Sequence, residues 1–188
     1  VVVKAKNKTI KSQYVKYNKK TGLLILKKSI KAEDKDNNII IAENAEFDEN
    51  KEIFRTFGPT NIITSEKYEV KGRDITINNK IKTISSNQPT SINDPEGNII
   101  ELQSFDYQLK NNIFKSIGLV KISDKLKNNY EFTQIYIDTK KKEILGTDIK
   151  AFLNEESIKV NPNNKPRVFA NSINLSNKKS TFNKSIFT

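Results

Sequence analysis

An alternating pair of apolar residues recurs along the chain at a step of 30 residues, and this periodicity limits the possible folds more than any other feature. An alternation of apolar and polar residues is typical of a strand with one covered face. The step rises to 38 residues before the last copy, beside a loop-forming segment that contains Pro162 and Pro166. The pairs are Val15/Tyr17, Ala45/Phe47, Ile75/Ile77, Phe105/Tyr107, Ile135/Ile137 and Ile173/Leu175.

A polar tip follows each pair, and an apolar segment then returns. Asp, Asn and Gly suit tight reversals, because they accept left-handed and Asx-turn geometry. Each repeat is therefore predicted to be a strand, a turn and a second strand. The predicted tips are Asn18–Gly22, Asp48–Glu52, Asn78–Lys80, Lys110–Asn112, Asp138–Glu143 and Ser176–Ser180.

The repeat length favours one all-β architecture over its alternatives. A propeller blade needs about 40 residues for its four strands, whereas about 30 residues supply two. A parallel β-helix is disfavoured because its rungs lack hairpin tips. We therefore predict a repeat-built β-jelly roll, a sheet folded over on itself like a taco, with about 11–13 antiparallel strands. Residues 1–188 are expected to form a single domain.

Composition excludes several kinds of chemistry. The chain has no Cys and no His, which excludes disulfides, thiolate chemistry and imidazole-based catalysis or metal binding. It contains no nucleophile elbow, phosphate-binding loop or dinucleotide fingerprint. We therefore expect no enzymatic activity, cofactor or metal. The net charge of +11 suits a polyanion, or simply a Lys-rich composition, but aromatic residues do not interleave with the basic clusters. No nucleic-acid partner is expected.

The apolar positions are the candidate site. If the folded sheet keeps its two inner faces apart, acyl chains can lie between them, and each buried methylene contributes about 0.8 kcal/mol. The alternative is that these side chains simply fill a core. The predicted lipid-binding residues are Tyr17, Ile25, Phe47, Ile53, Ile75, Ile77, Phe105, Tyr107, Ile113, Ile135, Ile137, Ile144, Ile173 and Leu175.

Two runs carry a resemblance to a known family. Residues 39–53, with Ala42, Ala45, Phe47 and Asp48, and residues 118–124, which begin Gly-Leu-Val-Lys-Ile, resemble the repeats of the OstA-like, or LptA-like, family of lipopolysaccharide export. The stretch 130–188 is most similar to the N-terminal periplasmic domain of the LPS-assembly protein LptD within that family. The motifs are degenerate, and the resemblance extends over nearly the whole chain.

The resemblance implies a periplasmic domain, associated with the outer membrane, that holds the acyl chains of lipopolysaccharide and passes the lipid toward an outer-membrane barrel. Implied partners are lipopolysaccharide, an LptA-like bridge protein joined by edge-strand pairing, and the barrel with its lipoprotein plug. The chain departs from the LptD pattern because the C-terminal barrel and the family's cysteines are absent. A free-standing bridge protein therefore stays open, as does a structural or polysaccharide-binding β-solenoid.

Overall fold

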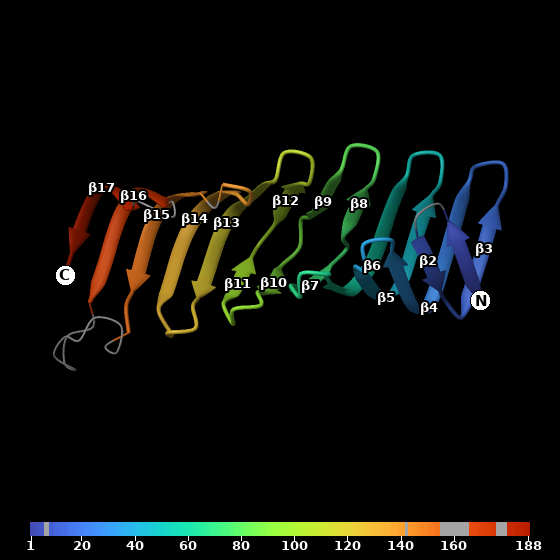
Figure 1. The fold of residues 1–188 in the computed structure, drawn as a ribbon, viewed down its shortest axis with the longest axis horizontal. Helices are drawn as coiled ribbons and strands as arrows, with labels where there is room; N and C mark the ends of the chain where they lie inside the picture. The colour runs from blue at the N-terminus through green and yellow to red at the C-terminus, as the bar shows by residue number, and fades with distance from the viewer. Residues whose placement is uncertain (6–7, 142, 155–165, 176–179) are drawn as a thin grey trace. The chain divides into compact units, whose positions relative to one another are not determined.

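The computed structural model describes residues 1–5, 8–141, 143–154, 166–175 and 180–188 (Figure 1). Seventeen strands and no helix occur in these residues, and every strand pairing that has a defined register is antiparallel. The chain divides into two compact units, unit 1 (Val1–Pro95) and unit 2 (Glu96–Thr188). The all-β antiparallel class predicted from the repeat is confirmed.

Unit 1 is built around three long strands, β4, β5 and β6, each of which pairs with its neighbours along its whole length. The two halves of β6 have different partners on their other side, because the first half pairs with β8 and the second with β7. The strands are β1 (Val2–Ala5), β2 (Lys8–Lys11), β3 (Tyr14–Asn18), β4 (Leu23–Asp34), β5 (Ile39–Asp48), β6 (Ile53–Ile63), β7 (Glu69–Arg73), β8 (Thr76–Asn78), β9 (Thr83–Ser86) and β10 (Thr90–Asn93).

Unit 2 is an antiparallel meander in which β13 to β17 pair in chain order, and the two halves of β13 also pair with β12 and β11. Its strands are β11 (Ile99–Leu102), β12 (Phe105–Gln108), β13 (Ile113–Ser123), β14 (Asn129–Asp138), β15 (Glu143–Phe152), β16 (Arg167–Leu175) and β17 (Ser180–Phe187).

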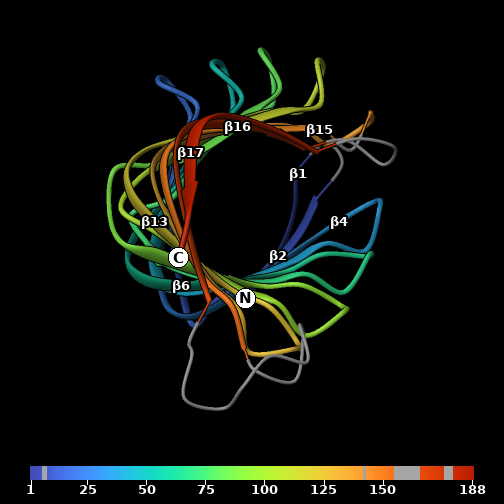
Figure 2. The same ribbon diagram turned by 90° about the vertical axis from the view of Figure 1, so that its left-hand side faces the viewer.

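The long strands bend at β-bulges. The register shifts between Lys27 and Ile30 in β4 and between Ile117 and Val120 in β13. The bulge residues have left-handed backbones, with φ of 64° at Lys28 and 99° at Gly118. A bulge bends its strand and increases the twist. The strands of unit 1 consequently curve around its interior, as the view along the strand stack shows (Figure 2).

The strand number exceeds the predicted 11–13 because eight short strands take the place of four long ones. The breaks lie between β2 and β3, between β7 and β8, between β9 and β10, and between β11 and β12. Asp74, between β7 and β8, has a left-handed φ of 50°. Pro89, between β9 and β10, has no N–H to donate to a ladder. These local features interrupt strands that the apolar pattern alone would continue.

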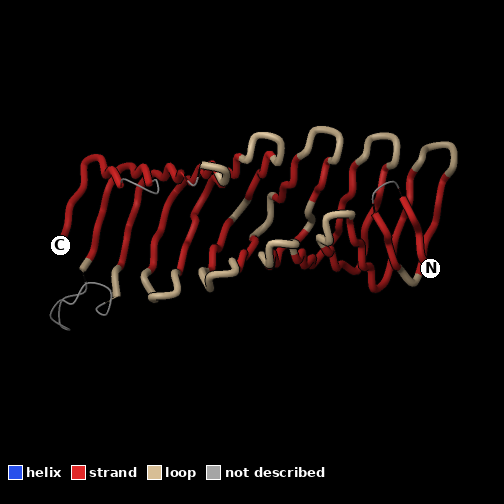
Figure 3. The backbone as a smooth tube through the Cα atoms, in the orientation of Figure 1, coloured by secondary structure: helices blue, strands red, loops and turns tan. Residues whose placement is uncertain are grey.

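Asx turns close the hairpin tips, which are drawn as tan loops in Figure 3. The Asn18 Oδ1 accepts the backbone N–H of Lys20 at 3.0 Å, and Asp138 Oδ1 likewise accepts that of Lys141 at 2.9 Å. Equivalent bonds are made by Asp48 and Asn78. At the other strand ends, left-handed residues recur every 30 positions, at Asn37, Lys67, Gly97 and Lys127. The repeat in the sequence is therefore also a repeat in the backbone.

Candidate functional site: the inner apolar faces

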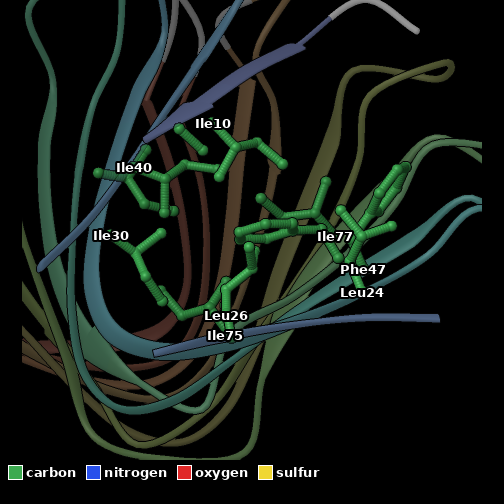
Figure 4. Close-up of a cluster of buried hydrophobic side chains, with 12 residues drawn as sticks. Ile10, Leu24, Leu26, Ile30, Ile40, Phe47, Ile75 and Ile77 are labelled. Atoms are coloured by element: carbon green, nitrogen blue, oxygen red, sulfur yellow. The ribbon is translucent and has the colours of Figure 1, made fainter. Parts of the chain in front are cut away.

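The inner face of unit 1 is filled by its own side chains. One row crosses four paired strands as Leu24, Phe47, Phe54 and Ile77, and each of these side chains is at most 7% exposed. The Phe47 and Phe54 rings lie 6.3 Å apart between centroids. These residues belong to a single cluster of buried apolar side chains, part of which Figure 4 shows inside the curve of the strands. The interior of unit 1 is therefore a packed core.

The inner face of unit 2 is covered less completely. Its first apolar row runs through Tyr107, Phe114, Ile137 and Ile144, which are register partners across four strands. Phe114 is 9% exposed, whereas Tyr107, Ile137 and Ile144 are only half-buried. The Phe114 ring contacts those of Phe105 and Tyr107, at centroid distances of 5.9 and 6.2 Å. The row is a continuous apolar surface that is partly accessible.

A second inner row lies on the other side of the β13 bulge. It runs through Ile100, Ile122, Tyr130, Ala151 and Val168, and all but Ala151 are half-buried. The side chains between the two rows are buried, and they include Leu102, Val120, Phe132, Ile135, Ile149 and Ile173. Unit 2 thus has a buried centre and two accessible apolar margins.

A polar cluster lies at the turn between β13 and β14, beside the middle of the second row. The Tyr130 hydroxyl donates to Asp124 Oδ2 at 3.2 Å, and Asn128 Nδ2 donates to the same oxygen at 2.8 Å. Burial, together with the adjacent Asp124 carboxylate, raises the pKa of Tyr130 to about 12. Burial alone would raise the pKa of Asp124, but hydrogen bonds from Asn128, Tyr130 and Leu126 bring it below its ordinary value. Tyr130 is therefore neutral and anchored at physiological pH.

The predicted site residues fall into four groups. Six are buried on inner faces, namely Phe47, Ile75, Ile77, Phe105, Ile135 and Ile173. Tyr107, Ile137 and Ile144 are half-buried on the inner face of unit 2. Ile25, Ile53 and Ile113 are half-buried on outer faces. Tyr17 is 47% exposed, and the Leu175 side chain lies outside the described part of the chain.

The prediction that Ile25, Ile53 and Ile113 face the interior is wrong, and register explains the error. Ile53 pairs with Asp48, while the next residue, Phe54, pairs with the inward Phe47. Ile25 pairs with Glu46, and Ile113 pairs with Asp138. A shift of one residue moves a side chain to the other face of a sheet. These three returning strands begin with adjacent apolar residues, so alternation alone does not choose between the two faces.

Tyr17 is also misplaced as an interior residue. It pairs with the buried Leu24 but belongs to β3, whose one defined pairing within the described residues is with β4. Its hydroxyl donates to Glu49 Oε2 at 2.8 Å, so the ring lies at the surface. Sequence reasoning also missed Leu24, Phe54, Phe114, Ile122 and Tyr130. The apolar doublets Ile53-Phe54 and Ile113-Phe114 were the available signal for two of them.

The part of the chain that the structure describes contains no group of three acidic, His or Cys side chains placed to hold a metal ion. Among the same residues, no helix is long and apolar enough to cross a membrane.

The architecture defines an antiparallel β-repeat protein with an apolar inner face. No family model and no curated protein matches the sequence. One solved structure with some likeness is LptH from Pseudomonas aeruginosa, the LptA-homologous periplasmic component of a lipopolysaccharide transport device. It is 12% identical, the match covers 73% of this chain and 79% of LptH, and the TM-score is 0.31. A likeness at this level does not establish a relationship.

Proposed function

We propose that this chain is a periplasmic lipopolysaccharide-transport domain, in which unit 2 holds acyl chains against its inner apolar rows. The observation that carries the proposal is the partial exposure of these rows. Tyr107, Ile137 and Ile144 on one margin, and Ile122 and Val168 on the other, are inward-facing yet only half-buried. Covering apolar surface stabilises a complex in proportion to the area removed from water.

The chemistry of these rows suits lipid chains. Each row continues from strand to strand without a charged side chain, so an acyl chain lying across the strands meets apolar atoms throughout its length. Each methylene buried contributes about 0.8 kcal/mol, and the contacts are non-directional. A chain can therefore shift along the row without breaking a specific bond. Such a surface is better suited to passing a lipid onward than to recognising one chain length.

The proposal includes the partners and location that the family resemblance implies. The lipid would arrive from an LptA-like bridge protein by edge-strand pairing and leave toward an outer-membrane barrel with its lipoprotein plug. Unpaired strand edges are suited to such β-augmentation. Residues 1–188 would act as one domain in this transfer, with the packed unit 1 as its rigid part. A free-standing bridge protein would use the same inner rows.

Site-specific photo-crosslinking to purified lipopolysaccharide tests the proposal. A benzophenone amino acid at Ile122 or Ile137 should capture the lipid, because both side chains lie on accessible inner margins. The matched control is Lys121, the neighbour of Ile122 on the outer face, which should capture none. Phe47, in the packed core of unit 1, should capture much less than Ile137. Equal capture at Lys121 and Ile122 would disprove the proposal.

A further inference from the structure

A trough with its own chemical character crosses the outer face of unit 2, over β14, β15, β16 and β17, which lie side by side in Figure 1. Its volume is about 430 Å³. One wall is the register row Tyr136, Leu145, Asn174 and Thr181, and the other is Gln134, Thr147, Ser172 and Asn183. The floor is the backbone of the row between them, which includes Gly146 and Ile173.

The trough is lined without a single charged side chain. Charged residues make up 29% of the chain, yet all ten lining residues are apolar, aromatic, amide-bearing or hydroxyl-bearing, or glycine. Lys115, the cross-strand neighbour of Tyr136 on β13, stands beside the lining and does not belong to it. An ionic ligand therefore finds no partner within the trough itself.

The repeat supplies an internal comparison. At the outer position of Tyr136 and Leu145, the repeat that contains β5 and β6 carries the cross-strand pair Glu46 and Arg55. One repeat before the trough, the same position holds Asp106 and Lys115, whereas two other repeats hold Lys16 with Ile25 and Thr76 with Ser85. In the trough this acid–base pair is replaced by an aromatic and an apolar side chain, which are 38% and 48% exposed. Adjacent exposed apolar side chains form a patch that a ligand can cover, and contiguous patches of this kind mark binding surfaces.

The polar groups of the trough are available to a ligand. The side-chain amides of Gln134, Asn174 and Asn183 make no hydrogen bond to any other residue in the described portions of the chain. Each amide offers both donors and acceptors. Amides beside an exposed tyrosine can bond the hydroxyls of a sugar ring while the ring face covers the aromatic surface.

We propose that this trough binds an uncharged saccharide chain, with ring faces against Tyr136 and Leu145 and hydroxyls bonded to the three amides. The site lies on the outer face of the sheet, opposite to the inner apolar rows. It therefore does not depend on the proposed lipid binding. A saccharide lying across the strands would meet successive polar side chains at the strand spacing of about 4.8 Å.

Titration with neutral and charged oligosaccharides tests the inference on the full chain. The probes are maltohexaose, cellohexaose and chitohexaose, with a hyaluronan hexasaccharide as the anionic comparison, and binding is followed by amide NMR shifts. At least one neutral probe should shift the side-chain amides of Gln134, Asn174 and Asn183, and the anionic one should not. No shift with any neutral probe, or shifts confined to other surfaces, would overturn the inference.

The decisive variant is Tyr136→Glu combined with Leu145→Arg, because it installs the pair that Glu46 and Arg55 already form on the same backbone. It should unfold at an unchanged temperature and bind at least about tenfold more weakly, as expected when an aromatic anchor is removed. Tyr14→Ala, which removes a 48%-exposed tyrosine from unit 1, should leave binding intact. Undiminished saccharide binding by the double variant would refute the proposed site in the trough. Failure of the lipid crosslinking experiment would refute the lipid proposal alone, because that experiment probes the inner face.

Discussion

Gly146 in β15 lies in a crowded position of the unit 2 interior, and adding one methyl group there tests the packing directly. It stands in the inner row between Ile135 and Ile173. A Cβ at this position would lie 2.5 Å from Phe132 Cδ1 and 2.8 Å from Phe132 Cε1. Favourable contact between carbon atoms needs about 3.5–4.0 Å. Phe132 is 4% exposed, so its ring has little room to move away.

The expected change in the free energy of unfolding for Gly146→Ala is the sum of two opposing effects. Overpacking a core by a methyl group costs about 1–3 kcal/mol. Alanine in a strand is more favourable than glycine by about 0.5–1 kcal/mol, which offsets part of that cost. Gly146→Ala should therefore lower the free energy of unfolding by about 1–2 kcal/mol. For a chain of this size the melting temperature should fall by roughly 2–8 °C.

A double-mutant cycle assigns the cause. Phe132→Val removes the two ring carbons that the new methyl group would meet, so the two substitutions should couple by about 1 kcal/mol or more. Urea unfolding of the two single variants and the double variant gives this coupling energy. Ala151→Gly, in the same strand but another row, should show no such coupling to Phe132→Val. If Gly146→Ala is as stable as the parent, or adds independently to Phe132→Val, the packing described for this row is wrong.

Three further outcomes follow from the turns and the polar cluster. Lys67 has a left-handed φ of 67°, and the equivalent position in the next repeat is Gly97 with φ of 92°. Left-handed geometry strains a residue that has a side chain, so Lys67→Gly should raise the free energy of unfolding, measured in urea, by about 0.5–1 kcal/mol. Gly97→Ala should lower the free energy of unfolding. Asn128→Ala should cost about 1–3 kcal/mol, since the buried Asn128 accepts the Asn154 N–H at 2.7 Å and its loss leaves that donor unpaired. Tyr130 has a pKa of about 12 in the folded chain, whereas an unfolded tyrosine loses its proton near pH 10. Its contribution to the free energy of unfolding is therefore complete below about pH 10 and is lost as the pH rises toward 12. Ultraviolet titration should show a tyrosine transition near pH 12 that is missing in Tyr130→Phe and occurs earlier in Asp124→Asn. Absence of this transition in the parent would contradict the assignment.

The repeat, the tips and the inner face of several strands could be predicted from the sequence because each depends on local chemistry. Asn18, Asp48 and Asp138 cap turns wherever the pattern places them. Single apolar residues that alternate with polar ones, as at Ala45 and Phe47, leave one choice of face. The buried face of the second strand in each repeat was harder to predict. Ile53 and Phe54, for example, are both apolar, and the pairing across the hairpin tip decides which of them is buried.

The difference between the two interiors could not be predicted from the pattern. Phe54 and Phe114 occupy equivalent places, yet Phe54 is fully buried beside a buried Ile77, while Phe114 lies in a row with the half-buried Tyr107 and Ile137. Exposure depends on how side chains from several strands fill the space between them, and the alternation of one strand does not contain that information.

Because the backbone repeats, departures from the repeat are more informative than the repeat itself. The same bulges, Asx turns and pairings support a filled core in unit 1 and accessible apolar margins in unit 2, so stability of the fold does not require those margins to be open. On the outer face, the backbone that accommodates Glu46 with Arg55 and Asp106 with Lys115 presents Tyr136 with Leu145 instead. Both departures expose apolar surface, both lie in unit 2, and they lie on opposite faces of one sheet. The two proposed ligands, a lipid chain inside and a sugar chain outside, would account for this arrangement without any change in the underlying fold.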